Sequence, residues 1–179
     1  MTPAIRKADK DLMREMERQV EIVYSAAAIA LHRHYGWGQK RILGLIEETK
    51  AIWNDCARDP DTSMLMMLER ETGIEIRARG VDKSFHELDF LVGTVADAHP
   101  MAPPEYILMR RRQIQWANPQ ITAALLLALH RIHGWSGVRD KRLLDLKDEV
   151  EAEYGWKPGR LIKACREETG INIVEETER

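Results

Sequence analysis

The residues best suited to chemistry in this sequence are its 6 histidines. His130 and His133 are three residues apart and can share a helix face, whereas His32 and His34 are two apart and point away from each other. The two pairs therefore do not repeat a set of metal ligands, and we expect no metal site. The sequence also contains no P-loop, dinucleotide-binding, HExxH, G-x-S-x-G or EF-hand motif. We expect no catalytic residues, no cofactor and no enzymatic activity.

The stretch around these histidines occurs twice in the chain. Residues 26–37 align with residues 124–135 at a spacing of 98, with seven of twelve positions identical. If the second copy holds a three-residue insertion after its Trp, Lys40-Arg41 matches Lys141-Arg142, Leu45 matches Leu146 and Glu48 matches Glu149. Further on, the residues Glu71 to Ile74 return as Glu168 to Ile171. The sequence thus indicates two diverged copies of one unit, 26–76 and 124–173.

Each copy has the pattern of three helices followed by an extended tail. Apolar residues at helical spacing predict helices from about Asp9 to Tyr35, over 40–53 and from about Thr62 to Thr72, and in the second copy over 124–133, 141–154 and 158–169. Gly36 and Gly134 supply the left-handed residue that ends the first helix. An Ile-x-Ile tail after each third helix is typical of a short strand. We predict a mainly α fold of two tandem three-helix units related by a pseudo-twofold.

A segment without a counterpart joins the two units. We divide the chain into an N-terminal unit, 1–76, a connecting segment, 77–120, and a C-terminal unit, 121–179. Within the connection, Ser84 to Asp97 has a capping box and predicts a helix. Glu105 to Trp116 has helical spacing and leads into the second unit.

The residues kept in both copies are the candidate ligand-binding residues. A structural interpretation accounts for several of them, because cations in the last turn complement the helix dipole and each Trp can pack over a helix end. The basic pair at the start of the following helix can simply be solvated, although the dipole disfavours a cation at that end. A bound anion such as phosphate explains that placement. The candidates are His32, Trp37, Lys40, Arg41, His130, Trp135, Lys141 and Arg142.

The repeated pattern Ala-Leu-His-x-x-x-Gly-Trp, followed by Lys-Arg, spans Ala30 to Arg41 and, interrupted by the insertion, Ala128 to Arg142. It resembles small uncharacterised accessory proteins encoded by phages and prophages of Gram-positive bacteria. The resemblance covers mainly the repeat units. It implies a phage accessory protein and assigns no catalytic residues.

Charge and hydropathy narrow the classes of partner. The formal net charge of −2 gives no global attraction to nucleic acid or anionic lipid. The longest apolar run, Ala123 to Leu129, is too short to cross a bilayer, and the N-terminal residues lack the apolar stretch of a signal peptide. We therefore expect no membrane partner and a cytoplasmic location, the host cytoplasm if the protein is phage-encoded.

Two functional hypotheses follow from the paired Gly-Trp/Lys-Arg corners. In the first, the protein is a non-enzymatic accessory binding protein that recognises a phosphorylated or nucleotide ligand, or a host protein. In the alternative, it is a DNA-binding regulator of helix-turn-helix type, with 26–35 as the supporting helix and 39–53 as the recognition helix. Acidic residues on that second helix, such as Glu47 and Asp55, count against DNA.

Overall fold

The structure is a computed structural model that describes residues 3–56, 63–76, 103–155 and 157–174. This part of the chain is mainly α, as predicted, with α1 (Pro3–Tyr35), α2 (Gln39–Cys56), α3 (Met64–Thr72), α5 (Pro103–His133), α6 (Gly137–Glu153) and α7 (Pro158–Thr169). The predicted strands are wrong for these residues, since none of them forms a strand and Ile173 begins a helical turn. Ile74 and Ile171 are instead buried among the helices, which makes each tail an anchor in the core.

Local signals fixed most of the helix ends. Ser63 caps α3 by accepting a hydrogen bond from the backbone N–H of Met66, and Gly36 and Gly134 both have a φ of 65°. The predicted helix over 105–116 is confirmed as the first part of α5. α1 begins at Pro3 rather than near Asp9. The prediction missed its first turns because they are polar and have little apolar periodicity. The helix predicted over 84–97 lies outside the described residues.

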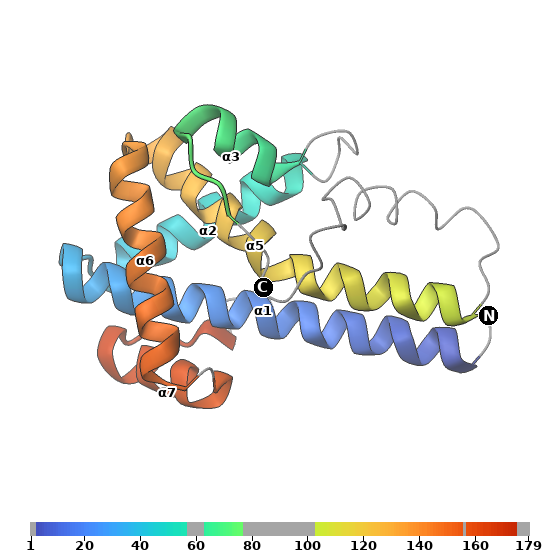
Figure 1. Ribbon diagram of the computed structural model, residues 1–179. Helices are drawn as coiled ribbons and strands as arrows, with labels where there is room; N and C mark the ends of the chain where they lie inside the picture. The colour runs from blue at the N-terminus through green and yellow to red at the C-terminus, as the bar shows by residue number, and fades with distance from the viewer. Residues whose placement is uncertain (1–2, 57–62, 77–102, 156, 175–179) are drawn as a thin grey trace.

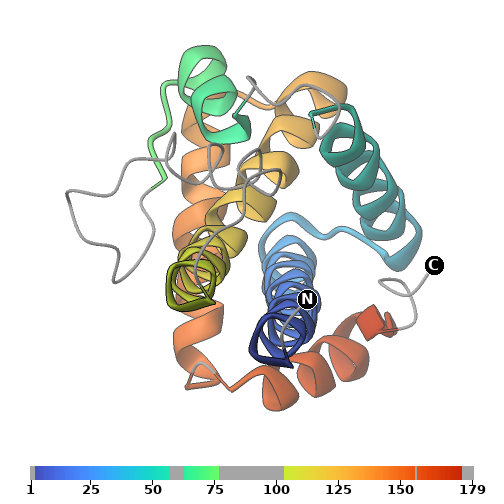
Figure 2. The same ribbon diagram turned by 90° about the vertical axis from the view of Figure 1, so that its right-hand side faces the viewer.

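The two long helices α1 and α5 run side by side in the same direction over their N-terminal halves (Figures 1 and 2). The phenol of Tyr106 donates to Asp9 Oδ1 at 2.6 Å, and Arg110 Nε donates to the same oxygen at 3.0 Å. Further along, the amide of Asn118 donates to Gln19 Oε1 at 3.2 Å. These contacts join residues about 98 positions apart and hold the two helices in a parallel register.

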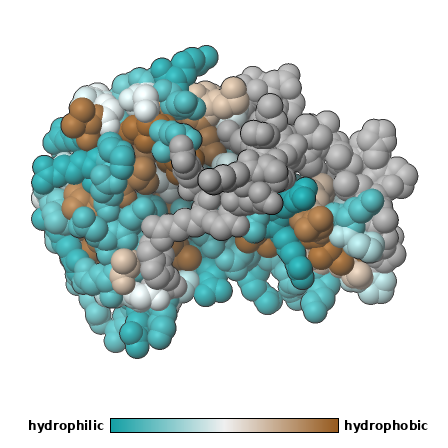
Figure 3. Space-filling view, in the orientation of Figure 1, coloured by the Kyte–Doolittle hydropathy of each residue, from teal (hydrophilic) through white to brown (hydrophobic). Residues whose placement is uncertain are grey.

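Beyond this pair, each long helix packs on helices from the other half of the chain. α1 lies against α6 and α7, whereas α5 lies against α2 and α3. Arg33 on α1 pairs with Glu168 at 2.7 Å and with Glu153 at 2.6 Å, and Arg131 on α5 pairs with Glu71 at 2.6 Å. The core therefore crosses the division between 1–76 and 121–179. Figure 3 shows that hydrophilic side chains cover most of the described surface on one face of this core.

The crossed packing predicts that neither half folds alone. Residues 1–76 and 77–179, produced as separate chains, each lose the helices that bury their long helix. We expect each fragment to have low helicity by circular dichroism and no cooperative melting, and an equimolar mixture to regain both. A cooperative transition in either isolated fragment would contradict the crossed packing.

The start of α6 approaches the end of α3 very closely. A Cβ added to Gly137 would lie 2.3 Å from the backbone oxygen of Thr72, whereas one added to Gly44, inside α2, would meet nothing within 4 Å. Only a glycine lets these two helix ends come together.

Alanine at these two glycines should therefore have opposite effects. We expect Gly137→Ala to lower the free energy of unfolding by about 1 to 3 kcal/mol, because α6 must move away from Thr72. Gly44→Ala serves as the control and should raise it by about 0.5 to 1 kcal/mol, because alanine favours an open helical position. Urea unfolding measures both, and equal changes would show that the close approach is absent.

Candidate functional site at the paired corners

Each long helix ends in the same backbone turn. After α1, the N–H of Trp37 donates to the carbonyl of Leu31 at 3.2 Å, and after α5 the N–H of Trp135 donates to the carbonyl of Leu129 at 3.1 Å. This is the hydrogen bond of a glycine-terminated helix, with the residue after the glycine folded back over the last turn. The backbone thus places Trp37 and Trp135 at equivalent corners.

A histidine fastens each corner. His32 Nδ1 lies 3.0 Å from the carbonyl oxygen of Trp37, and His130 Nδ1 lies 2.8 Å from that of Trp135. Since a carbonyl oxygen can only accept, each Nδ1 carries the proton and donates it. Both histidines were predicted as ligand-binding residues. In the structure, the Nδ1 of each is engaged in a hydrogen bond that holds the corner together.

The two corners touch each other through their aromatic rings. The rings of Trp37 and Trp135 are 5.7 Å apart, Tyr35 packs on Trp135 at 4.8 Å, and His133 packs on Trp37 at 5.2 Å. Only 3% of Trp37 and 2% of Trp135 is exposed. Each ring is buried against the opposite half of the chain and has little surface left for a ligand, so the predicted ligand contact of these two residues finds no support in this geometry. The sequence alone did not reveal that the corners meet.

An arginine covers each buried tryptophan from the solvent side. The guanidinium of Arg41 lies 3.8 Å from the centre of the Trp37 ring, and that of Arg139 lies 4.5 Å from the centre of the Trp135 ring. We call Arg41 and Arg139 the arginine pair. The sequence comparison matched Arg41 with Arg142, whereas in the structure the counterpart of Arg41 is Arg139. α2 and α6 begin 98 residues apart, so no insertion separates Trp135 from its arginine. The spacing Trp-x-x-x-Arg, present in both copies, would have identified Arg139.

The other predicted basic residues lie beside the arginine pair rather than over the rings. Lys40 and Arg142 are exposed, and Lys141 pairs with Asp145 one turn further along α6. Within the described part of the chain, no carboxylate pairs with either guanidinium of the arginine pair. Arg33 and Arg131, by contrast, are both engaged by glutamates. The arginine pair therefore keeps its N–H donors available.

The unfavourable placement of cations at these helix starts has a partial structural explanation. The side chain of Gln39, at the start of α2, donates to the carbonyl of Gly170 at the end of α7 at 3.1 Å. Gly137, at the start of α6, lies close to the backbone carbonyl of Thr72 at the end of α3. A helix C-terminus carries partial negative charge, which offsets the positive end of the neighbouring helix. The dipole argument for a bound anion is weaker than the sequence indicated.

A buried carboxylate in the second corner was missed by sequence analysis. Asp140 is 0% exposed, and neither of its carboxylate oxygens has a hydrogen-bond partner among the described residues. Burial raises the pKa of Asp140 to about 7, although His130, whose Nδ1 is 4.0 Å away, and Arg139 act in the opposite direction. At the spacing of 98, its counterpart is the buried Ile42. The assumed insertion hid this exchange of isoleucine for aspartate.

Asp140 should make stability depend on pH. An aspartate in an unfolded chain titrates near pH 4, so between about pH 4 and pH 7 the folded state holds this proton and the unfolded state does not. Stability from this group is complete below about pH 4 and is lost as the pH rises through about 7. We expect Asp140→Asn to raise the melting temperature above that of the wild type by an amount that grows across this interval. Asp145→Asn, exposed on the same helix, is the control, and a difference independent of pH would contradict the assignment.

In the comparisons with known proteins, no protein-family model, curated protein or solved structure matches the chain. Among the described residues, no group of three His, Cys, Asp or Glu side chains is arranged to hold a metal ion. None of the described helices combines the length and the apolar character needed to cross a membrane.

Proposed function

We propose that the chain is an internally duplicated, non-enzymatic binding protein, and that the arginine pair is its recognition site. The duplication is supported by contacts that recur at a spacing of 98: His32 and His130 on their corners, Arg33 and Arg131 on opposite glutamates, and Arg41 and Arg139 on their tryptophans. Two equivalent sites favour a partner with two matching groups. Phage origin and a place in the host cytoplasm stay predictions of the sequence.

The observation that carries the proposal is the state of the two guanidinium groups. A guanidinium that lies over an aromatic ring has fewer orientations open to it than one in free solution, and its N–H groups stay accessible to a ligand. Such a group is preorganised to bind a carboxylate or phosphate in a bidentate manner, with less loss of side-chain entropy than a free arginine. Lys40 adds a further exposed cation beside Arg41.

A protein partner with an acidic surface suits this site better than a nucleotide. Because Trp37 and Trp135 are buried, neither of these rings offers a face on which a base can stack. Small ligands also favour concave sites, and the pocket found in the structure lies elsewhere, with neither arginine of the pair in its lining. We infer that the partner is a host protein that presents two acidic groups. A phosphorylated ligand is the second candidate, because phosphate binds the same donors.

The helix-turn-helix alternative finds less support. A recognition helix of that motif packs against its supporting helix, whereas α2 packs chiefly on α5 and makes few contacts with α1. The exposed Glu47 near the middle of α2 would also repel a phosphate backbone.

Replacing the arginine pair tests the proposal. We expect the wild type to bind a poly-glutamate peptide, and Arg41→Ala and Arg139→Ala each to weaken that binding by about 1 to 2 kcal/mol, since each removes one charge-assisted contact. Isothermal titration calorimetry with the peptide, inorganic pyrophosphate and a nucleoside triphosphate measures the effect. Tighter binding of a phosphate compound than of the peptide would select the second candidate.

Arg142→Ala is the matched control, because Arg142 is exposed on α6 but covers neither Trp37 nor Trp135. It should change binding by less than about twofold, within the range of an unspecific change in net charge. Melting temperatures separate binding from folding, since loss of an exposed cation–π contact costs only about 0.5 to 1 kcal/mol. No binding of any of these anions, or equal weakening by all three substitutions, would contradict the proposal.

A further inference from the structure

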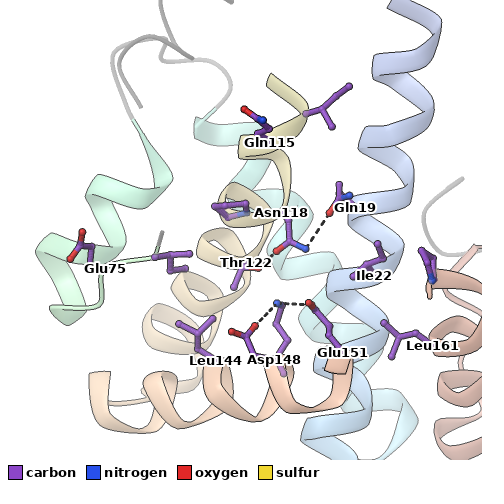
Figure 4. A pocket seen from close by; sticks show the side chains of 15 residues that line it. Gln19, Ile22, Glu75, Gln115, Asn118, Thr122, Leu144, Asp148, Glu151 and Leu161 are labelled. Atoms are coloured by element: carbon purple, nitrogen blue, oxygen red, sulfur yellow. Dashed lines mark hydrogen bonds and ion pairs between the residues drawn. The ribbon is translucent and has the colours of Figure 1, made fainter. Parts of the chain in front are cut away.

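The N-terminal halves of α1 and α5 form a two-helix arm that extends away from the other described helices (Figure 1). Hydrogen bonds show which side of α1 faces α5. Asp9 accepts from Tyr106 and Arg110, and Gln19 accepts from Asn118 beside the pocket shown in Figure 4. The inner side of the arm is thus fixed by contacts, and the opposite side of α1 faces solvent.

Four basic side chains form a row on this outer side. Arg6, Lys7, Lys10 and Arg14 are all exposed. With 3.6 residues per turn, they fall within about 100° of the helix circumference, centred about 150° from the inner side. They span about 12 Å along the helix. We call these four residues the basic row.

The stability of α1 does not account for the basic row. Like charges four residues apart, as in Arg6, Lys10 and Arg14, repel each other and destabilise a helix. Cations near the start of a helix also oppose its dipole, and the first turn of α1 contains no acidic residue to balance them. Binding of an anion explains both features.

Neighbouring carboxylates do not neutralise the basic row. Among the described residues, none of its four cations forms an ion pair. Two other arginines of the arm are paired: Arg18 with Glu15 at 3.8 Å, and Arg110 with Asp9 at 3.0 Å. The charges of the basic row are therefore available to a partner.

The tip of the arm is basic, whereas the chain as a whole is slightly acidic. The first three turns of α1 and α5, residues 3–14 and 103–112, contain seven basic and three acidic side chains. The whole chain contains 27 Lys and Arg against 29 Asp and Glu. The acidic excess thus lies outside the tip. Such a local positive field attracts a polyanion even though the net charge is negative.

Duplex DNA fits the basic row better than other anions do. A small anion favours a concave site, and none of the four cations lines the pocket shown in Figure 4. A single strand favours aromatic side chains for stacking, and the row has none. The major groove of B-form DNA is about 12 Å wide and admits an α-helix between its two rows of phosphates. The major groove of A-form RNA is too narrow for that.

We propose that the outer face of α1 binds duplex DNA through its phosphates, with the helix in the major groove. Arg6 and Lys10 lie about 70° around the helix from Lys7 and Arg14, so the two pairs reach opposite strands. Phosphate contacts give affinity without reading the sequence. The exposed Glu17 repels phosphates and limits the contact to the first three turns. This proposal is independent of the arginine pair, which lies beyond the other ends of the same helices.

Fluorescence anisotropy with a labelled DNA duplex of about 20 base pairs, at about 50 mM salt, tests the proposal. We expect the wild type to bind, and the triple variant Arg6→Gln, Lys10→Gln, Arg14→Gln to bind at least about tenfold more weakly. The slope of the logarithm of affinity against the logarithm of salt concentration should fall by about 2 to 3, since three phosphate contacts are lost. Glutamine has a helix propensity close to that of lysine and arginine, so α1 should remain helical.

The matched control removes three exposed cations from α7. Arg160→Gln, Lys163→Gln, Arg166→Gln makes the same change in net charge far from the arm, and should weaken DNA binding by less than about threefold. Should the arm variant lose helicity by circular dichroism, Arg14→Gln alone should lower the salt slope by about 1.

The two proposed sites can fail separately. The arm variant should leave binding of the poly-glutamate peptide unchanged within about twofold, and Arg41→Ala should do the same for DNA. The DNA proposal is overturned if the wild type does not bind the duplex at about 100 μM protein. It is also overturned if the α7 control weakens binding as much as the arm variant, or if an RNA duplex of the same sequence binds equally well.

Discussion

The burial of two long helices against the opposite halves of the chain is the constraint on which the rest of the structure depends. From Val23 to Leu31, α1 is buried on every side, and α5 is buried in the same way from Ile121 to Leu129. A helix that is apolar all round needs neighbours on all its faces. Its own half supplies too few of them, because α1 and α2 barely touch, so α6 and α7 complete the enclosure. The two halves must therefore fold together.

The crossed packing also determines what the corners can do. Because each long helix ends against the other half, Trp37 and Trp135 meet at 5.7 Å and are removed from solvent. The tryptophans become the rigid support, and the arginines stacked on them become the accessible surface. Both arginines over these tryptophans are exposed, so the accessible surface at the corners is cationic rather than aromatic.

The sequence predicted the helices, the glycine turns and the matched corners, because these depend on signals within one turn of helix. Gly36 and Gly134 are such signals, and each ends its helix as expected. The sequence could not predict the crossed packing, since a helix with apolar residues on all faces does not specify which neighbours cover it. An assumed insertion then displaced the alignment of α6, which hid Arg139 and Asp140. Matching charged residues by type alone favoured Arg142, although the equal spacing after each tryptophan identifies Arg139.

The difference between α2 and α6 is as informative as their similarity. At the spacing of 98, the buried Ile42 and Thr49 and the partly buried Trp53 on α2 correspond to the buried Asp140, Lys147 and Glu151 on α6. Uncompensated burial of charge destabilises a fold, and the raised pKa of Asp140 is one sign of that cost. The half with neutral side chains shows that the architecture has an apolar solution. In the second half, buried charged residues replace part of that neutral packing. The two corners, by contrast, each have one arginine over a tryptophan. The two corners are thus alike in their arginines, whereas the aligned buried positions on α2 and α6 differ in charge.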